Sequence, residues 1–134
     1  MSASVAVKNI VIGTGRPKIC IPLMDPDPSS LSQTVSQLGE LPFDLVEWRA
    51  DALKNPLSPD VRLEALTLLR RLLPRTPILF TLRTAAEGGL ANVNPEEYEE
   101  ILMDAIRSGL PDLVDIELSW GEERTKRLLY AVHE

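Results

Sequence analysis

The fold is indicated most directly by residues 45–51, Leu45-Val46-Glu47-Trp48-Arg49-Ala50-Asp51. The stretch reads as a strand, and because side chains alternate along a strand, Glu47, Arg49 and Asp51 share one face. An unpaired buried ion costs several kcal/mol, so a charged strand face is a poor device for stability. Charges aligned toward the end of a strand are typical of a binding site.

Three further apolar segments have the character of strands: Lys18–Met24, Ile78–Thr84 and Leu113–Ser119. Together with Leu45–Asp51 they are spaced roughly 30 residues apart, which is the length of a βαβ unit. The spacing therefore predicts an α/β fold with a parallel sheet and right-handed crossovers. Before the first of these strands, Val5–Val7 and Ile10–Ile12 predict a short antiparallel hairpin.

Start and stop signals for four helices lie between and after these strands. The first helix is expected from Asp27-Pro28 to Gly39, the second from Ser58-Pro59 to Pro74, the third from Asn94-Pro95 to Gly109, and the fourth from about Gly121 onward. Asn94 and Glu97 have the spacing of a capping box. The expected apolar stripes are Leu31, Val35 and Leu38; Leu63, Leu66, Leu69 and Leu73; Tyr98, Ile101, Leu102, Ala105 and Ile106; and Leu128, Leu129 and Val132.

Two architectures share this repeating unit, an open doubly wound sheet and a closed (β/α)₈ barrel. The open fold binds nucleotides through a glycine-rich first turn, whereas the first turn here is the acidic Asp25-Pro26-Asp27-Pro28. Polar residues instead gather at the carboxyl ends of the strands, where barrel enzymes build their sites. The pattern favours a barrel, although a whole barrel needs eight units and about 250 residues and this chain supplies four.

Composition excludes several classes of function. A net charge of -6 argues against nucleic acid as the main partner, and no apolar run is long enough to span a membrane. The amino terminus lacks the pattern of a secretory signal. The one cysteine, Cys20, is expected to be a buried core thiol and fits a cytoplasmic protein, while the one histidine, His133, rules out a multi-histidine metal site within this chain.

Glu47, Arg49 and Arg83 form the strongest candidate site. Arginine presents a planar fork to carboxylates, and a neighbouring glutamate accepts hydrogen bonds from hydroxyl groups. The three residues together suit a small, polyhydroxylated and carboxylated ligand. The alternative interpretation is a lattice of internal ion pairs.

Three more acids follow the later strands. Glu87 stands before Gly88-Gly89 in a tight or mobile loop, where it either orients a proton donor or is a solvated surface residue. Asp115 and Glu117 share a strand face and either help Glu47 to hold a divalent cation or, as we favour, pair with the arginines. Trp48 is expected to pack in the core, and the sequence leaves the role of Trp120 open.

These motifs carry a resemblance to a known family. Glu47-Trp48-Arg49-Ala50-Asp51, Leu79-Phe80-Thr81-Leu82-Arg83-Thr84 with Glu87-Gly88-Gly89, and Val114-Asp115-Ile116-Glu117-Leu118 resemble type I 3-dehydroquinate dehydratase in order and spacing. The resemblance covers essentially the whole chain. It departs at Pro22, where many members have a small polar residue.

The resemblance implies a fold and an activity. Family members are (β/α)₈ TIM barrels of the shikimate pathway, lyases that convert 3-dehydroquinate to 3-dehydroshikimate through a lysine imine, without a cofactor or metal. By resemblance, Glu47, Arg49 and Arg83 contact the substrate, and Glu87 supports the acid–base histidine. The chain then corresponds to the first four βα units, a single partial domain over residues 1–134 with the hairpin at about 5–12 and the units at about 18–134.

The family's imine-forming lysine and catalytic histidine lie on later strands, beyond Glu134. The lysines present are Lys8, Lys18, Lys54 and Lys126, and none is placed in a desolvated pocket. We therefore expect substrate-contacting residues without the chemistry, in a chain that self-associates or pairs with a complementing second half. The alternative is a non-catalytic half-barrel that serves as a binding or assembly module.

Overall fold

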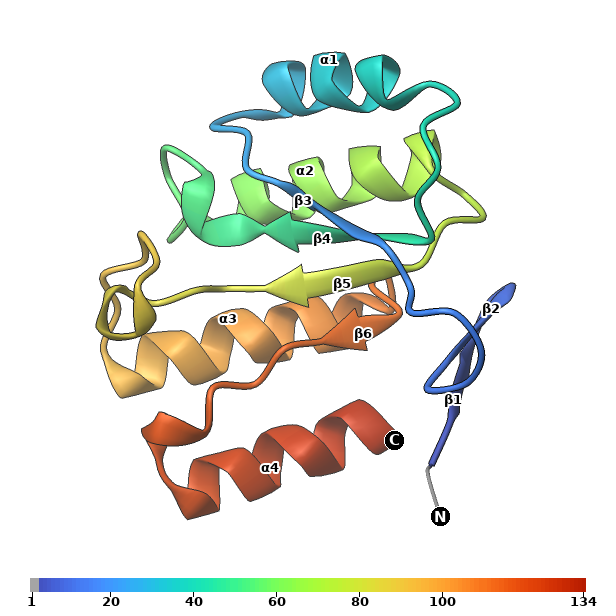
Figure 1. Ribbon diagram of the computed structural model, residues 1–134. Coiled ribbons are helices and arrows are strands. Elements are labelled where there is room, and N and C mark those ends of the chain that lie inside the picture. The colour runs from blue at the N-terminus through green and yellow to red at the C-terminus, as the bar shows by residue number, and fades with distance from the viewer. Residues whose placement is uncertain (1–2) are drawn as a thin grey trace.

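A computed structural model describes residues 3–134 of the chain (Figure 1). The first two strands, β1 (Val5–Val7) and β2 (Ile10–Ile12), form an antiparallel hairpin, as predicted. The other strands form one parallel sheet in the order β3-β4-β5-β6. Their bounds are β3 (Cys20–Leu23), β4 (Leu45–Arg49), β5 (Ile78–Thr81) and β6 (Leu113–Val114). The predicted α/β fold with a parallel sheet is confirmed.

One α-helix follows each strand of the parallel sheet: α1 (Pro28–Leu38), α2 (Pro59–Leu72), α3 (Pro95–Ser108) and α4 (Glu122–His133). Short 3₁₀ turns cover Ala50–Ala52, Ala85–Glu87 and Leu118–Trp120. No helix within residues 3–134 is long and apolar enough to cross a membrane. The predicted partial domain starts at residue 1, and residues 1–2 lie outside the described part.

The predicted cap residues begin and end the first three helices. Asp27, Ser58 and Asn94 each accept a hydrogen bond from a backbone N–H in the first helical turn. The capping box of Asn94 and Glu97 forms in both directions. Gly109 ends α3 in the left-handed conformation, at φ 68°, where glycine has no steric penalty.

The hydrophobic core lies between the helices and one face of the sheet. Val46, Trp48, Ile78 and Phe80 point into it from β4 and β5, and each is at most 1% exposed. Leu31, Leu66 and Leu69, Leu102 and Leu128 meet them from α1, α2, α3 and α4 in the same cluster. The core confirms the packing expected of Trp48 and leaves the opposite face of the sheet without helices (Figure 1).

The strands end earlier than the sequence predicts. β5 stops at Thr81 because the Arg83 N–H donates to the carboxylate of Asp51 instead of continuing the ladder. β6 spans two residues instead of seven, since the Glu117 N–H donates to the hydroxyl of Tyr98. Polar side chains thus replace the ladder where the strands end.

Four apolar residues expected inside lie on the surface: Cys20, Leu63, Leu129 and Val132. Cys20 belongs to the edge strand β3, where Ile21 and Leu23 point toward the helices and Cys20 and Pro22 toward the uncovered face. Leu63 is displaced because its neighbour Arg62 takes the inward position on α2 and pairs with Asp104 of α3 at 2.8 Å. On α4, Leu128 alone is fully buried.

Candidate functional site

Glu47 and Arg49 lie on the face of β4 that the helices leave uncovered. Their neighbours Val46 and Trp48 point the other way into the core, as strand alternation requires. The Glu47 carboxylate accepts a hydrogen bond from the Thr81 hydroxyl at 2.8 Å. The parallel register brings β5 alongside, with Arg49 opposite Thr81.

Arg49 is held by a planar fork to Asp51. Its Nε donates to Oδ1 and its Nη2 to Oδ2, both at 2.8 Å. Asp51 also accepts hydrogen bonds from the N–H groups of Arg83 and Leu90. Burial on its own would raise the pKa of the Asp51 carboxyl, but the Arg49 fork and the two backbone donors outweigh it and hold the pKa below its usual value. The same fork raises the pKa of Arg49.

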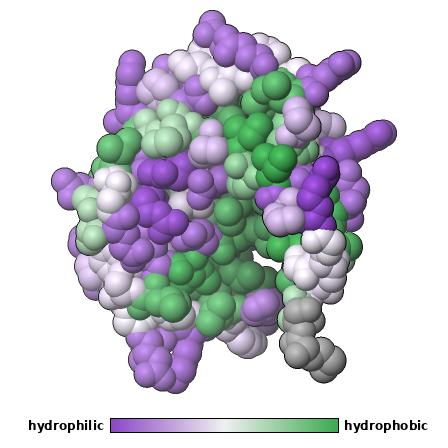
Figure 2. Space-filling view, in the orientation of Figure 1, coloured by the Kyte–Doolittle hydropathy of each residue, from purple (hydrophilic) through white to green (hydrophobic). Residues whose placement is uncertain are grey.

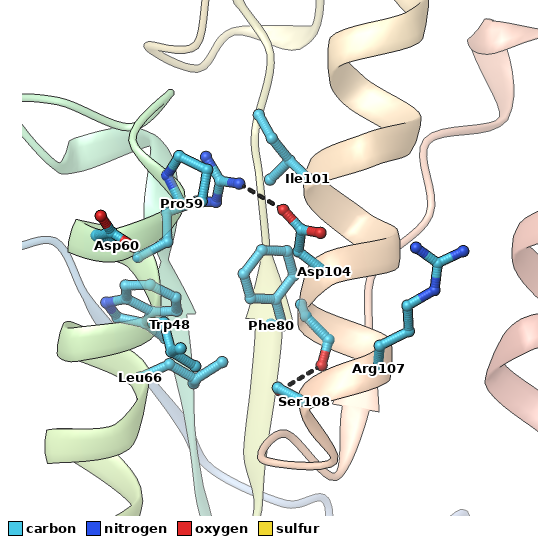
Figure 3. A pocket seen from close by; sticks show the side chains of 12 residues that line it. Trp48, Pro59, Asp60, Leu66, Phe80, Ile101, Asp104, Arg107 and Ser108 are labelled. Atoms are coloured by element: carbon cyan, nitrogen blue, oxygen red, sulfur yellow. Dashed lines mark hydrogen bonds and ion pairs between the residues drawn. The ribbon is translucent and has the colours of Figure 1, made fainter.

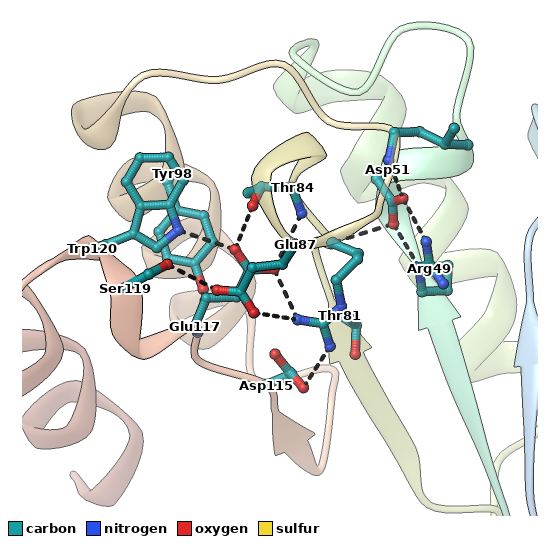
Figure 4. A network of polar contacts seen from close by, with 12 residues as sticks. Arg49, Asp51, Thr81, Thr84, Glu87, Tyr98, Asp115, Glu117, Ser119 and Trp120 are labelled. Carbon is teal, nitrogen blue, oxygen red and sulfur yellow. Dashed lines mark hydrogen bonds and ion pairs between the residues drawn. The ribbon is translucent and has the colours of Figure 1, made fainter.

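Arg83 lies two residues past the end of β5 and reaches toward the segment after β6. Its Nη1 donates to Glu117 at 2.8 Å and its Nη2 to Asp115 at 3.0 Å, while Glu87 stands 3.8 Å away (Figure 4). Burial disfavours the charged guanidinium, yet the carboxylates of Asp115 and Glu117 raise its pKa above the usual value. Asp115 and Glu117 are therefore partners of an arginine, which is the interpretation favoured from sequence.

Glu117, like Asp51, is a buried carboxylate that accepts four hydrogen bonds, and it is 3% exposed. Besides Arg83, it accepts hydrogen bonds from the Thr84 hydroxyl at 2.6 Å, the Thr84 N–H at 3.1 Å and the Trp120 indole N–H at 3.1 Å. Burial alone would raise the pKa of Glu117, but these donors lower it. Trp120 also stacks on Tyr98, with ring centroids 4.9 Å apart. Trp120, undecided from sequence, thus belongs to the rim of the site.

Glu87 sits in a closed loop rather than an open one. Thr84 and Ala91 form a bridge across the loop base, and Gly88 adopts a left-handed conformation at φ 88°. A Cβ on Gly89 would overlap the carbonyl oxygen of Arg83, so the loop tolerates only glycine there. The Glu87 carboxylate is exposed and accepts a hydrogen bond from Ser119 at 2.8 Å.

The structure brings the predicted residues to one edge of the sheet. Hydrophilic side chains gather over the carboxyl ends of the strands, and hydrophobic residues lie over the middle of the same face (Figure 2). The guanidiniums of Arg49 and Arg83 each have five N–H groups. Each of them donates two hydrogen bonds to carboxylates, so three N–H groups remain for a ligand. Within residues 3–134 there is no group of three metal-ligating side chains, so the cation alternative has no geometric support.

Sequence reasoning missed the hydroxyl groups of the network, which come from Thr81, Thr84, Tyr98 and Ser119. One signal was available for Thr81, because it stands two residues before Arg83 and so shares its strand face. The hydroxyls of Thr84 and Ser119 come from turns and that of Tyr98 from a helix. No local sequence pattern predicts that these segments approach the site.

A separate cavity of about 340 Å³ lies on the helix side of the sheet, between α2 and α3 (Figure 3). Trp48 and Phe80 form its floor, and the ion pair of Arg62 and Asp104 crosses it. None of Glu47, Arg49, Arg83 and Glu87 lines this cavity. We place the candidate site on the uncovered face because the groups able to bind and orient a polar ligand converge there.

Comparison with known proteins gives consistent matches along nearly the whole chain. Residues 19–134 match the model of the family described as type I 3-dehydroquinase. The 3-dehydroquinate dehydratase of Neisseria gonorrhoeae strain NCCP11945 is 45% identical over 127 residues, which are 95% of this chain and 50% of that protein. The enzyme of the same name from Escherichia coli K12 strain DH10B is 38% identical over 130 residues, 97% of this chain and 52% of that protein.

Comparison with solved structures identifies the same kind of enzyme. The type I 3-dehydroquinate dehydratase from Clostridium difficile, carrying covalently modified comenic acid, superposes with a TM-score of 0.94 at 34% identity over 98% of this chain and 52% of that one. The 3-dehydroquinate dehydratase from Geobacillus kaustophilus HTA426 superposes with a TM-score of 0.87 at 32% identity over 97% of this chain and 52% of that one. The chain spans about half the length of the curated relatives that it matches.

Proposed function

Because this chain belongs to the type I 3-dehydroquinase family, we propose that it is the amino-terminal half of a 3-dehydroquinate dehydratase. The whole enzyme would be a hydro-lyase that converts 3-dehydroquinate to 3-dehydroshikimate through a lysine imine. The four βα units after the hairpin would be the first half of a (β/α)₈ barrel, with residues 1–134 as one partial domain. The coverage of 52% of the Clostridium difficile chain and of the Geobacillus kaustophilus chain supports this division.

The observation that carries the proposal is the position of Glu47, Arg49 and Arg83 at or just past the carboxyl ends of the neighbouring strands β4 and β5, with Glu47 and Arg49 on the face without helices. The free N–H groups of the two guanidiniums suit the substrate carboxylate, and the Glu47 carboxylate suits a ring hydroxyl. Glu87 stands beside Arg83, where it would support the acid–base histidine. In such a site the imine supplies the electron sink, so neither a metal nor an organic cofactor is needed.

The lysines and the histidine of this sequence are either exposed or bonded to groups other than the candidate site residues. Lys8 pairs with Asp112 at 3.6 Å, Lys18 donates to the backbone at Thr14 and Arg16, and Lys126 pairs with Glu122 on α4. Lys54 and His133 are exposed. A nucleophilic lysine needs a desolvated pocket that lowers its pKa. We therefore propose that the chain contacts substrate and that a second segment supplies the lysine and the histidine.

The test uses the purified chain with 3-dehydroquinate. Alone, it should give no absorbance rise from the enone product, and borohydride should trap no substrate adduct. Addition of the carboxyl-terminal half of the Neisseria gonorrhoeae relative should restore both signals. An adduct on any lysine of the chain alone, with Lys54 the first to inspect, contradicts the proposal.

A matched pair of variants tests the site residues in the restored enzyme. Arg83→Ala should lower activity at least about a hundredfold, because it removes a charge-assisted contact to substrate and leaves the buried Glu117 carboxylate and the partly exposed Asp115 carboxylate without their arginine partner. Arg75→Ala removes an exposed arginine that makes no ion pair within residues 3–134 and should leave activity unchanged. Equal loss in both variants would rule out a specific role for Arg83.

The second candidate is a non-catalytic half-barrel that acts as a binding or assembly module. The observation behind it is the pair of outer strands, β3 and β6, each with one neighbour within the described residues. An assembly module would form a defined oligomer and would not regain activity with a complementing half. The complementation experiment therefore separates the two candidates.

A further inference from the structure

The Asp51 carboxylate joins three parts of the chain at one point. Oδ1 accepts from Arg49 Nε at 2.8 Å and from the Arg83 N–H at 3.2 Å. Oδ2 accepts from Arg49 Nη2 at 2.8 Å and from the Leu90 N–H at 3.0 Å. The Asp51 side chain has no solvent exposure. A buried carboxylate with four donors is fixed in position and fixes its donors in turn.

Two of those donors bracket the loop that carries Glu87. Arg83 stands at the entry of the loop and Leu90 at its exit, and both backbone N–H groups end on Asp51 (Figure 4). Between them the Gly89 N–H donates to the Thr84 carbonyl at 2.8 Å, which closes the loop on itself. The loop is thus held at both ends by one carboxylate, from the 3₁₀ turn that follows β4.

We propose that Asp51 is a positioning residue that fixes Arg49, Arg83 and the Glu87 loop in position relative to one another. The proposal rests on the proposed function, since these three groups form a ligand site only if that function holds. Asp51 would touch no ligand itself. It would act by orienting the Arg49 fork and by holding the entry and exit of the loop.

The chemistry requires a carboxylate at this position. The Arg49 fork needs two acceptor oxygens, and the two backbone N–H groups need the same two oxygens. An asparagine has nearly the same shape but offers one acceptor oxygen. In place of Oδ1, its NH₂ group would face Arg49 Nε and the Arg83 N–H; in place of Oδ2, it would face Arg49 Nη2 and the Leu90 N–H. Two of the four hydrogen bonds would therefore become donor–donor contacts.

The experiment measures hydrogen exchange by NMR in the whole chain and in Asp51→Asn. We expect the Leu90 N–H and the Arg49 Nε–H to exchange at least about tenfold faster in the variant, because each of them loses either its acceptor oxygen or the negative charge of that acceptor. The Val46 N–H, bonded to the Pro77 carbonyl in the sheet, should keep its rate. A purely structural role would accelerate Val46 by the same factor as Leu90.

Two further variants sharpen the result. Asp60→Asn changes an exposed acid at the start of α2 and should leave all three rates unchanged. Gly89→Ala opens the loop from its own side, because the new Cβ would overlap the Arg83 carbonyl oxygen, and leaves the fork intact. It should accelerate the Leu90 N–H and spare the Arg49 Nε–H.

Titration with 3-dehydroquinate separates this proposal from the proposed function. The unaltered chain should bind the compound about tenfold more tightly than Asp51→Asn does, and Asp60→Asn should bind it as tightly as the unaltered chain. If the unaltered chain binds none, the proposed function fails for this chain, whereas the exchange pattern still decides the role of Asp51. Unprotected Leu90 and Arg49 signals in the unaltered chain, or unchanged ones in Asp51→Asn, would overturn the proposal.

Discussion

At the scale of single residues, Glu99 joins α3 to α4 through two arginines. Its carboxylate accepts from Arg124 Nε at 2.8 Å and from Arg127 Nε at 2.7 Å. The Arg127 hydrogen bond lowers the pKa of Glu99 most, and Arg124 contributes less. Together they outweigh the effect of partial burial and bring the pKa from 4.5 to about 2. A carboxyl whose pKa falls on folding stabilises the fold fully above its unfolded pKa, and that stabilisation disappears as the pH drops from about 4.5 to 2.

Glu99→Gln should therefore lower the free energy of unfolding at pH 7 by about 1 kcal/mol or less, because the pair is partly exposed and screened by solvent. The difference from the unaltered chain should vanish near pH 2. Urea unfolding across this pH range checks both. Glu100→Gln, at an exposed position of α3 without an ion pair within residues 3–134, serves as the control. A difference that persists at pH 2 would contradict the linkage.

Single residues also show how far the sequence predicts the site. Strand alternation was enough to place Glu47 and Arg49 on one face of β4, and the arginine partner of Asp115 and Glu117 followed from charge. The same prediction for Asp51 was wrong, because the strand ends at Arg49 and Asp51 lies in the 3₁₀ turn that follows. The hydroxyl of Tyr98 was beyond prediction, because it reaches Glu117 from a helix on the core side. The prediction that Cys20 is buried was wrong, because a residue on an edge strand is buried only if another element covers its face of the sheet.

At the scale of elements, α3 shows the closest agreement between sequence and structure, because its signals are local. Asn94→Ala removes one half of the capping box and should lower the free energy of unfolding by about 1 kcal/mol. Asn92→Ala changes an exposed residue outside the helix and should have little effect. Urea unfolding of both variants checks the prediction, and equal losses would show that the cap contributes nothing.

The shortness of β6 has a different cause and was not predictable from its own residues. Val114-Asp115-Ile116-Glu117 has the alternation of a strand, yet the ladder stops at Val114. Beyond it, Asp115 and Glu117 pair with Arg83, which lies in the segment just after β5. Helix ends depend on neighbours along the chain, whereas strand ends depend on what the adjacent strand offers.

At the scale of the whole molecule, the outer edges of β3 and β6 and the uncovered face predict association. Unpaired strand edges and apolar surface are templates for pairing with another chain. The isolated chain should be a dimer or larger at micromolar concentration, or else loosely packed and prone to aggregate. Size-exclusion chromatography with light scattering measures this, and a compact, cooperatively unfolding monomer would contradict it.

Cys20→Lys offers a way to test which surface is responsible. A charge at this exposed position on β3 opposes edge pairing and should shift the chain toward monomer. Ser36→Lys places the same charge on the exposed side of α1 and should leave the mass unchanged. Equal effects would mean that net charge, rather than the β3 edge, governs association.

The stack of Tyr98 on Trp120 has an optical consequence. Two aromatic rings 4.9 Å apart and 17° from parallel are held in an asymmetric environment, so they should contribute a strong near-ultraviolet circular dichroism signal in the packed state and none in a molten one. Trp48 is 1% exposed and packs beside Phe80 within the core, whereas Trp120 lies at the margin of that core and donates to Glu117 near the strand ends. A small ligand at the strand ends should therefore change the near-ultraviolet signal of Trp120 and leave that of Trp48 unchanged. The near-ultraviolet spectrum would then report both whether the uncovered face is folded and whether a ligand is bound there.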